Sequence, residues 1–583
     1  MAIPAPSRAD TELSEQPVIR RRVEVQPEGE WSADVPEVLR KIHAARGSRE
    51  ARQAWPRLAD LPSPESLLDI GRAVALLHDA LDGDRHIVIS SDFDCDGATA
   101  CAVMLRGLKM LGARRLSFAV PDRMRHGYGL TPGFVDELET LQPDLVVTVD
   151  HGIACHAGIA EARKRGWDVL VTDHHLPGET LPDADAIVDP NRHGDSFPCK
   201  SLAGVGVAFY VLSALRAAMR AQGDARADGA DLSSLLDLVA VGTVADLVPL
   251  DANNRALVAA GLRRLRSGKG CPGLRALIDV SGRDMARLGT MDIAFSIAPR
   301  INAAGRLDDM RIGIRCLATD DPAEARALAA VLHEINAARR EVQDGMVAEA
   351  LADVPQVDDD VAALCLFDSD WHPGVIGLVA SKLVERHHRP ALTFARSEPE
   401  STSLRGSARS IAGVHMCDVI ARIDTLHPGL IDRFGGHAMA AGLTLDEARL
   451  EEFRVAFIDT VAAQLNADVL ERVLWSDGSL SVDGIDHTLA LALRDGGSWG
   501  QGYPEPAFDD VFDVLQSRCV GGKHLSLELG REGRRWRAIQ FNGWTEQALP
   551  SRIRALYRPA PDDWKGGDAV QLMVLHIEPL PST

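Results

Sequence analysis

An apolar run that ends in alternating aspartates is the feature that most constrains how this chain can fold. Residues 87–89 are Ile-Val-Ile, and Asp92, Asp94 and Asp96 follow shortly after them. In an extended chain, side chains at every second position point to one face, so this spacing predicts three carboxylates side by side where a buried strand ends. Such crowded charges repel one another unless a hard cation such as Mg²⁺ or Mn²⁺ compensates them. For this motif alone, a surface turn rich in Asp and Gly remains the alternative.

The overall composition indicates a globular protein of several domains. A length of 583 residues suggests roughly three or four domains, and 46% hydrophobic with 25% charged residues is typical of globular chains. The formal net charge of −21 argues against a protein that coats nucleic acid non-specifically, but leaves room for a nucleic-acid enzyme with a local basic channel. The nine cysteines show no C-x-x-C pair, and neither a secretory signal nor an apolar run of roughly 18 residues is present. We therefore expect a cytoplasmic protein with reduced thiols.

Apolar runs alternate with helical patterns through the first half of the chain. Strands are predicted at 87–89, 145–149 and 168–171, with helices at 98–111 and 158–165 between them. Strands that alternate with helices imply a largely parallel sheet. Ahead of them, 36–80 has a helical pattern that Pro62 and Pro64 interrupt. Beyond them, the apolar stretch 234–250 continues the α/β pattern.

The second half of the chain shows a long helix, a further α/β unit and a barrel-like pattern. The helix is predicted over 322–352, with Asp321 as its cap and Glu324 completing a capping box. Residues 360–450 form a second α/β pattern, whereas short alternating runs between Gly-rich turns at 470–583 predict an antiparallel sheet or barrel. The predicted organisation is a flexible arm (1–35), an α/β catalytic domain (36–285), a linker with the long helix (286–355), a second α/β domain (356–455) and a barrel (465–583).

Acidic and imidazole side chains recur where the predicted strands end. Asp150 follows the second strand, Asp173, His174 and His175 follow the third, and Asp246 lies in the later apolar stretch, whose neighbourhood is either strand or helix. Ligands of open α/β sheets bind outside the carboxyl ends of the strands, so these side chains are expected to meet at one edge. Together they supply enough ligands for two divalent ions, which at about 3.5–4 Å apart clamp the attacking and leaving oxygens of a phosphoryl displacement. Taken singly, Asp150 is equally consistent with a turn or cap, and His174 with a core histidine.

This ordered set resembles the motif series of the DHH phosphoesterase superfamily. The wider pattern, which covers about 40–580, resembles the RecJ family of single-strand-specific DNA exonucleases within it. The motifs that carry the wider resemblance are 121–123 (PDR) with 127–129 (GYG), 204–206 (GVG), 298–306 (APRINAAGR), 371–377 (WHPGVIG), and 435–437 (GGH) with 440–442 (AAG), the last pair being similar to the signature of the accessory DHHA1 domain.

The resemblance implies a role for each residue of the set. Asp94 and Asp150 are expected to hold one Mn²⁺ or Mg²⁺ ion, with Asp92 near it. Asp96, His174 and Asp246 are expected to hold a second ion, and Asp150 to bridge the two. His175 is expected to contact the scissile phosphate, while Asp173 orients a histidine. Some DHH phosphatases carry a further histidine where this chain has Ser90, so protein groups would ligate the first ion less completely.

The same motifs imply groups that bind a nucleic-acid strand. Five arginines are predicted to lie in loops and to contact phosphates, because the guanidinium group is well shaped for phosphate: Arg123, Arg300, Arg306, Arg405 and Arg409. Tyr128 and Trp371 are expected to stack on bases. Near the C-terminus, basic residues interleaved with aromatics resemble an OB-fold surface for single strands, although half of those aromatics are equally suited to a barrel core. The expected substrate-binding residues are Arg123, Tyr128, Arg300, Asn302, Arg306, Trp371, His372, Arg405, Arg409, His437, Arg535 and Trp536.

The expected function is hydrolysis of single-stranded DNA from the 5′ end to 5′-mononucleotides, in DNA repair and recombination. The metal chemistry follows from the residues, whereas the polarity and the preference for DNA come from the resemblance. The expected partners are single-stranded DNA, single-strand-binding protein and a RecQ-type helicase. No association with a membrane is expected. Two alternatives stay open: another DHH phosphoesterase that cleaves short oligoribonucleotides, cyclic dinucleotides or pyrophosphate, and a non-catalytic DNA-binding scaffold.

Overall fold

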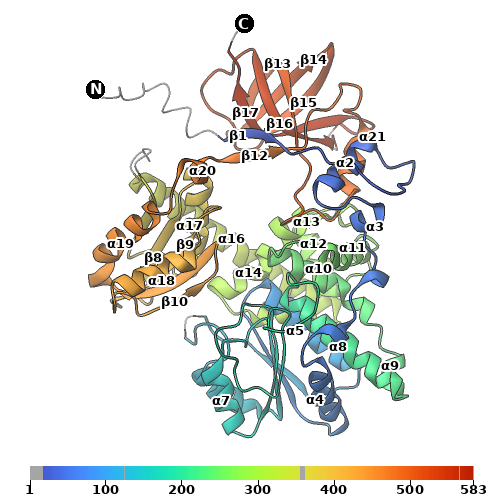
Figure 1. Cartoon of the computed structure of the whole chain (residues 1–583), viewed down its shortest axis with the longest axis vertical. Coiled ribbons are helices and arrows are strands. Elements are labelled where there is room, and N and C mark those ends of the chain that lie inside the picture. The colour runs from blue at the N-terminus through green and yellow to red at the C-terminus, as the bar shows by residue number, and fades with distance from the viewer. Residues whose placement is uncertain (1–16, 124, 355–360, 563–564, 582–583) are drawn as a thin grey trace. The chain divides into compact units, whose positions relative to one another are not determined.

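The computed structural model describes residues 17–123, 125–354, 361–562 and 565–581 (Figure 1). Contacts divide the chain into two units. The larger unit contains Arg22–Asn336 and Asp477–Thr583, and the smaller contains Ala337–Ser476 with the segment up to Arg21. The division falls inside the long helix α16 (Pro322–Asp353), which the sequence predicted over nearly the same residues.

A five-stranded parallel sheet forms the centre of the larger unit. Its order is β3-β2-β4-β5-β6, and its strands are β2 (Ile87–Ser91), β3 (Leu116–Ala119), β4 (Leu145–Val149), β5 (Asp168–Thr172) and β6 (Ala186–Val188). The three predicted strands are confirmed, because continuous apolar runs are what a sheet buried on both faces requires. On β4, Leu145 and Val147 belong to one hydrophobic cluster and Val146 to another.

Helices cover both faces of this sheet and supply the two clusters. One face packs on α6 (Pro132–Leu138) and α7 (His156–Lys164). The other face packs on α5 (Cys95–Met110), α8 (Gly204–Ala221) and α10 (Leu236–Ala245). Helix α8 is long and apolar enough by composition to cross a membrane, but most of its residues are buried in this core.

The stretch 234–250 is helical as far as Ala245, which places Asp246 at the C-terminal cap of α10. Helix α10 is buried around its whole circumference, so its sequence lacks the polar face that marks an ordinary surface helix. The remaining helices of this region are α4 (Ile70–Asp82), α9 (Ala225–Asp228), α11 (Ala252–Arg266), α12 (Pro272–Val280), α13 (Thr290–Asp292), the π-helical turn η6 (Ile293–Ile297), α14 (Ala298–Leu307) and α15 (Arg311–Ala318), with 3₁₀ turns at Glu139–Leu141, Leu232–Leu235 and Met285–Arg287.

The segment 36–80 is helical with interruptions, as its prolines indicated. Helices α2 (Glu37–Ala45) and α3 (Ala51–Ala54) precede 3₁₀ turns at Leu58–Asp60 and Pro64–Ser66. On α2, the buried His43 ring lies 2.7 Å from the Tyr503 hydroxyl through Nδ1 and 3.1 Å from the Gly496 carbonyl through Nε2. Burial lowers the pKa of His43 to about 3, so this neutral ring fastens the N-terminal helices to the segment ahead of the C-terminal barrel.

The cap of α16 agrees only in part with the predicted capping box. Asp321 Oδ1 accepts a hydrogen bond from the Ala323 amide at 2.8 Å, as a cap does. Glu324, however, binds Arg315 at 2.7 Å and the Thr319 hydroxyl at 2.6 Å instead of turning back to the cap. The capping-box prediction is therefore wrong for Glu324, because an arginine and a hydroxyl from the preceding turn compete for its carboxylate.

The smaller unit is built on a mixed sheet in the order β10-β11-β9-β8-β7. Its elements are β7 (Leu364–Phe367), α17 (Ile376–His387), β8 (Ala391–Arg396), β9 (Ser403–Arg409), α18 (Met416–Leu426), β10 (Arg433–Gly436), β11 (Ala440–Asp446), a 3₁₀ turn at Glu447–Arg449, α19 (Leu450–Ala462) and α20 (Ala467–Leu470). Strand β1 (Val18–Arg21) pairs in parallel with β12 (Val473–Ser476), so part of the predicted arm is a strand. Residues 1–16 of that arm lie outside the described residues.

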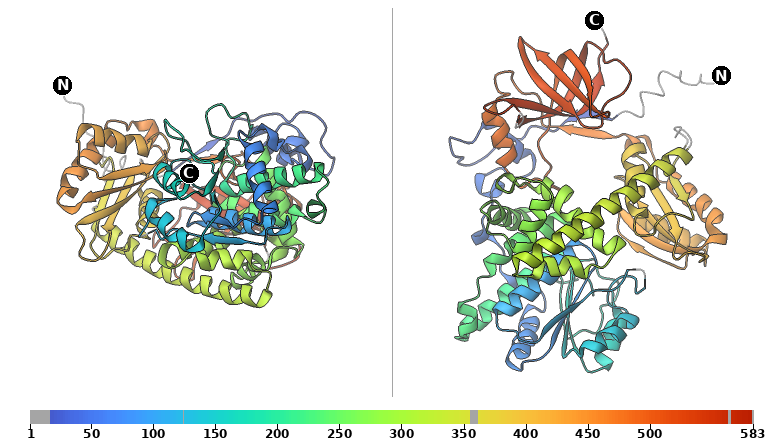
Figure 2. Two further views of the ribbon diagram at one scale, coloured as in Figure 1. Left: turned by 90° about the horizontal axis from the view of Figure 1, so that it is seen from below. Right: turned by 180° about the vertical axis from the view of Figure 1, so that it is seen from behind.

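The C-terminal region is a closed barrel preceded by helix α21 (His487–Asp495). All neighbouring strands are antiparallel except β15 and β17, and Phe508, Phe512 and Tyr557 fill the interior. The right-hand view of Figure 2 shows these strands from behind. The barrel order is β13 (Phe508–Val520), β14 (His524–Arg531), β15 (Arg534–Gln540), β17 (Val570–Pro579) and β16 (Arg552–Pro561). The predicted barrel is confirmed.

Candidate metal centre

The register of the parallel sheet brings four aspartates to one edge. Ser91, Val149, Thr172 and Val188 are paired across the ends of β2, β4, β5 and β6. The next residue along each strand is an aspartate: Asp92, Asp150, Asp173 and Asp189. All four are buried, at 5%, 2%, 1% and 0% exposure. The carboxyl edge of the sheet, where ligands of such folds bind, is therefore a row of buried carboxyl groups.

The opening aspartates do not share one extended face, as their spacing had suggested. Strand β2 ends at Ser91 and helix α5 begins at Cys95. Asp94 is the cap of this helix, with Oδ1 accepting a hydrogen bond from the Gly97 amide at 3.0 Å, and Asp96 lies in the first turn. The prediction of a continuous extended run is wrong because capping by Asp94 starts the helix immediately. The turn into the helix still keeps all three carboxylates at the same edge.

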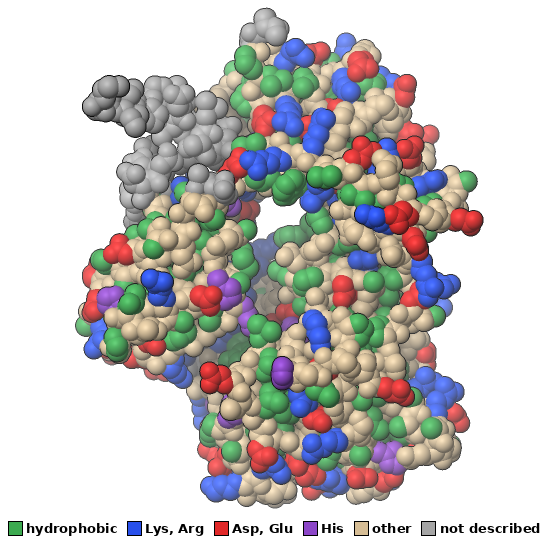
Figure 3. Space-filling model, in the orientation of Figure 1, with side chains coloured by type: hydrophobic (Ala, Val, Ile, Leu, Met, Phe, Trp, Pro, Cys, Tyr) green, Lys and Arg blue, Asp and Glu red, His purple; other side chains and the backbone are tan. Residues whose placement is uncertain are grey.

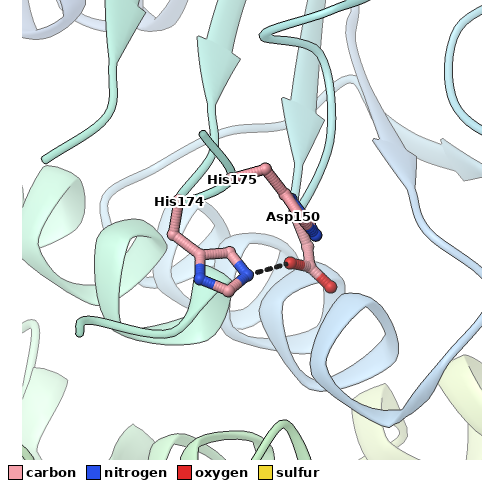
Figure 4. A group of neighbouring side chains, drawn as sticks. All are labelled: Asp150, His174 and His175. Carbon is pink, nitrogen blue, oxygen red and sulfur yellow. Dashed lines mark ion pairs between the residues drawn. The ribbon is translucent and has the colours of Figure 1, made fainter. Parts of the chain in front are cut away.

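The possible ligand atoms fall into two groups, which overlap with a third formed by Asp150, His174 and His175. Oxygens of Asp92, Asp94 and Asp150 lie within 4.8 Å of one another, and so do atoms of Asp96, His174 and Asp246. His174 Nε2 lies 3.0 Å from Asp150 Oδ1, 3.5 Å from Asp246 Oδ2 and 4.0 Å from Asp96 Oδ2. Asp150 thus belongs to one group and touches the other, and Figure 4 shows it facing the His174 ring.

The charges at this edge fit divalent cations. Burial and the charge of Asp94 raise the pKa of Asp92 to about 8 and that of Asp96 to about 7. Burial and the charge of Asp96 hold the pKa values of Asp150 and Asp246 well above the ordinary range. Asp92 Oδ1 is buried and accepts no hydrogen bond from the residues that the structure describes. Carboxylates in this state need a compensating charge, and hard cations prefer their oxygens.

Backbone groups and glycines shape the space around Asp96. Its two oxygens accept hydrogen bonds from the Gly204 amide at 2.7 Å and the Val205 amide at 3.0 Å. These amides begin helix α8, whose N-terminal end favours negative charge. A Cβ on Gly204 would lie 2.6 Å from Asp150 Oδ1, and one on Gly242 would lie 2.7 Å from Asp96 Oδ1. The 204–206 motif therefore holds the Asp96 carboxylate through two amides and leaves room for Asp150.

His175 is held by two neighbours at the entrance of the site. Its Nδ1 lies 2.7 Å from Asp173 Oδ1, and its Nε2 lies 3.5 Å from the Tyr128 hydroxyl, which also donates to the Asp150 carbonyl at 3.2 Å. Burial lowers the pKa of His175, but the hydrogen bond and charge of Asp173 and the charge of Asp246 outweigh burial and raise it to about 9. The contact with Asp173 thus fixes the orientation of the His175 imidazole.

Asp189 is a member of the row that the sequence analysis missed. Its Oδ1 accepts a hydrogen bond from the Asn191 amide at 2.7 Å, and the Asn191 side chain donates to the His174 carbonyl at 2.6 Å. Burial and the charge of Asp173 raise the pKa of Asp189 to about 7. The signal was present, because Asp189 follows the apolar run 186–188. That run of three residues is too short to stand out as a strand.

Two residues predicted to bind substrate belong to one helix, and one of them contacts the aspartate loop. Arg300 and Asn302 lie on helix α14 and not in a loop. Asn302 Oδ1 accepts a hydrogen bond from the Cys95 amide at 2.8 Å, and buried Arg300 donates to the Ser296 carbonyl at 2.5 Å. On the same helix, a Cβ on Gly305 would lie 1.9 Å from the Phe93 carbonyl. Helix α14 therefore packs directly against the turn between Asp92 and Asp96.

The other predicted binding residues are placed as follows. Arg123 lies in a turn, as predicted, with its guanidinium 4.2 Å from the centre of the Phe93 ring. Arg306 lies on α14, and Arg405 and Arg409 lie on β9, so the loop prediction is wrong for all three. The glycines close to these arginines suggested loops, although the residues around them form a regular helix and a regular strand.

Burial argues against base stacking by two of the aromatic residues. Trp371 is 4% exposed and donates to Glu349 at 3.0 Å, and Trp536 is 7% exposed with its ring against Phe512 inside the barrel. His372 Nδ1 accepts from the Gly374 amide, and His437 follows the exposed strand β10. Arg535 is exposed on the barrel, 3.4 Å from Glu528. Trp371, His372, Arg405, Arg409 and His437 belong to the smaller unit.

A parallel sheet whose strand ends carry a group of carboxylates beside a group of carboxylates and imidazole defines the class of DHH phosphoesterases. Residues 86–243 match the DHH family N-terminal domain, 358–463 the DHHA1 domain and 476–576 the RecJ OB domain. The chain belongs to the RecJ family.

Two of its relatives match over nearly their full length. The single-stranded-DNA-specific exonuclease RecJ of Dickeya dadantii is 45% identical over 95% of this chain and 98% of its own, and that of Escherichia coli is 42% identical over 97% and 100%. The structure of Thermus thermophilus RecJ in complex with Mn²⁺ matches with a TM-score of 0.80 and 32% identity, covering 96% of this chain and 80% of that one. Its complex with Mg²⁺ matches with a TM-score of 0.76 and 30% identity, covering 97% and 78%.

Replacing Gly204 by alanine is expected to weaken metal binding. The added methyl group would overlap Asp150 Oδ1 and push apart groups that share the same ions. We expect Mn²⁺ affinity, measured by titration calorimetry, to fall by about 10- to 100-fold, as when outer partners of metal ligands are lost. Gly133→Ala is the matched control, because nothing lies within 4 Å of a Cβ there. Equal Mn²⁺ affinity in both variants would contradict this account.

Asn302→Ala is expected to lower activity while leaving strand binding unchanged. It removes the acceptor for the Cys95 amide and so loosens the turn between Asp94 and Asp96. We expect kcat to fall about tenfold at constant KM for single-stranded DNA, with recovery in Asn302→Asp, which keeps the acceptor. A rise in KM alone would show instead that Asn302 binds substrate.

Proposed function

We propose that this chain hydrolyses single-stranded DNA from the 5′ end to 5′-mononucleotides with two Mn²⁺ or Mg²⁺ ions. The observation that carries the proposal is the pair of ligand groups that meet at Asp150. All the ligands are present, which disfavours a non-catalytic scaffold. Relatives named as single-stranded-DNA-specific exonucleases match this chain across all three domains, which disfavours a phosphoesterase for short substrates.

The residues divide the work at the site. Asp94 and Asp150, with Asp92 beside them, would hold one ion, and Asp96, His174 and Asp246 with Asp150 would hold the other. When bound, two such ions stabilise charge on the attacking and leaving oxygens and make water more acidic. His175, oriented by Asp173, donates a hydrogen bond to an oxygen of the scissile phosphate, where negative charge increases during the displacement.

The barrel supplies a second surface for the strand. A cavity of about 740 Å³ is lined by residues of β15, of the loop between β16 and β17 and of the start of α21, with basic and acidic side chains interspersed. Strands β14 and β15 correspond to the face with which OB folds bind single strands. On the face shown in Figure 3, acidic and basic side chains of the described residues are interspersed, so local patches rather than net charge attract the substrate. The basic lining residues are Arg534, Arg535, Arg537 and Lys565.

The cellular setting follows from this activity. An enzyme that removes nucleotides from a 5′ end needs a helicase to expose the strand and works on strands coated by single-strand-binding protein. We therefore propose a RecQ-type helicase and single-strand-binding protein as partners in cytoplasmic DNA repair and recombination. Pull-down of each purified partner tests this: binding to neither would remove the partners without affecting the hydrolytic activity.

Loss of a metal ligand is expected to abolish degradation from the 5′ end. Single strands labelled at the 5′ or the 3′ end, and matching duplexes, are incubated with Mn²⁺ or Mg²⁺. We expect 5′-mononucleotides from single strands, and a loss of at least about a hundredfold in Asp94→Ala and Asp150→Ala. Asp183→Ala, at a position whose side chain is 91% exposed, is the control and should keep full activity. Degradation from the 3′ end, or full activity in both ligand variants, would sink the proposal.

Mn²⁺ is expected to stabilise the folded protein through the same ligands. A ligand that binds only the folded state stabilises it by about 2.7 kcal/mol at a hundred times its Kd. Calorimetry should therefore show Tm rising with Mn²⁺ concentration in the wild type, and rising much less in Asp150→Ala. Removal of metal by EDTA should return the wild type to its lower Tm. An equal rise in both proteins would place the ions elsewhere.

A further inference from the structure

An exposed leucine in a strained backbone conformation follows one of the metal ligands. Leu247 comes directly after Asp246, has φ = 59° and is 65% exposed. The left-handed region is unfavourable for a residue with a bulky side chain, and exposure of leucine to water is also unfavourable. Backbone strain and an exposed apolar side chain thus occur together at one position beside the metal centre. This combination points to a function, because strained residues cluster at functional sites.

The loop beyond Leu247 is fixed by hydrogen bonds that impose this conformation. The Leu250 amide donates to the Gln501 carbonyl at 2.8 Å, and Asn254 donates to the Pro249 carbonyl at 3.0 Å. Arg255 donates to the Leu250 carbonyl at 2.7 Å. The strain at Leu247 is therefore held by its surroundings, and the side chain stays in water beside Asp246.

A second exposed leucine follows His175 on the neighbouring loop. Leu176 is 69% exposed, and the two loops meet at the contact of 3.5 Å between His174 Nε2 and Asp246 Oδ2. Tyr128, 48% exposed, adds an aromatic ring where its hydroxyl contacts the Asp150 carbonyl. Exposed apolar side chains thus adjoin the metal centre on three loops, and apolar groups gathered in this way mark a binding surface.

We propose that Leu247 and Leu176 pack against the nucleoside next to the scissile phosphate, an inference that rests on the proposed function. Only the base and the sugar of a DNA strand offer apolar faces, and the strand must pass these loops to reach the ligands. Contact with an apolar face does not depend on the hydrogen-bonding groups of a base, so all four bases fit. The leucines therefore favour a nucleotide over a phosphodiester that lacks a nucleoside, and they do not select for the base sequence.

A double-mutant cycle between side chain and base tests the proposal. The variant is Leu247→Asn, because asparagine tolerates the left-handed region and has a similar size but a polar end. The substrates are single strands with a normal first and second nucleotide, or with one abasic residue at either position. Leu176→Ala serves as the second variant. The control is Gln142→Asn, since Gln142 also has a positive φ of 49° but precedes β4 at the other edge of the sheet.

The proposal gives a distinct pattern of kcat/KM. On normal strands we expect about a tenfold loss in Leu247→Asn with unchanged Tm, and none in Gln142→Asn. The wild type should lose about tenfold on one of the two abasic strands, and Leu247→Asn should lose nothing further on it. The proposal would be overturned if, in both Leu247→Asn and Leu176→Ala, the loss from the substitution multiplied with the loss from the abasic residue at both strand positions. Activity of the wild type on normal strands tests the proposed function separately.

Discussion

Repulsion among buried carboxylates is the constraint on which the rest of this structure depends. Asp92, Asp96 and Asp150 are each 5% exposed or less, and Asp94 and Asp246 add their charges at the same edge. The fold compensates with fixed dipoles: the first amides of α8 bind Asp96, and the N-terminal end of α5 lies beside Asp94. These groups lower the cost without removing it, so the site is complete only with cations.

The parallel sheet can supply this arrangement because its register is fixed from both faces. A shift of one residue would turn every apolar side chain of a strand to the opposite cluster, at a cost in close packing on both faces. The same register sets the residues after Ser91, Val149, Thr172 and Val188 in one row. Apolar packing along the strands therefore determines where the carboxylates at their ends lie.

The sequence predicted those parts of the fold and site that depend on local pattern. Apolar runs located β2, β4 and β5, and the aspartates that come within three residues of each run lie at one edge of the sheet. It failed to reveal contacts between residues far apart in the chain: Asn302 accepts a hydrogen bond from the Cys95 amide, 207 residues away. It also failed where two neighbouring rules compete, since capping by Asp94 ended the extended run. Asp189 was missed because β6 has only three residues.

Backbone strain and charge at this centre have one physical origin. Asp150 and Leu247 both have positive φ, of 63° and 59°, and each such residue costs about 1–3 kcal/mol. At Asp150 the left-handed turn brings the carboxylate back over the strand end toward His174 instead of along the strand. An unstrained backbone would direct the Asp150 carboxylate elsewhere and lower its repulsion with the neighbouring carboxylates. Packing of the core beneath the sheet edge must therefore offset both the strain and the repulsion. Stability is thus concentrated in the two buried faces of the sheet, and its edge is left to be completed by ions and substrate.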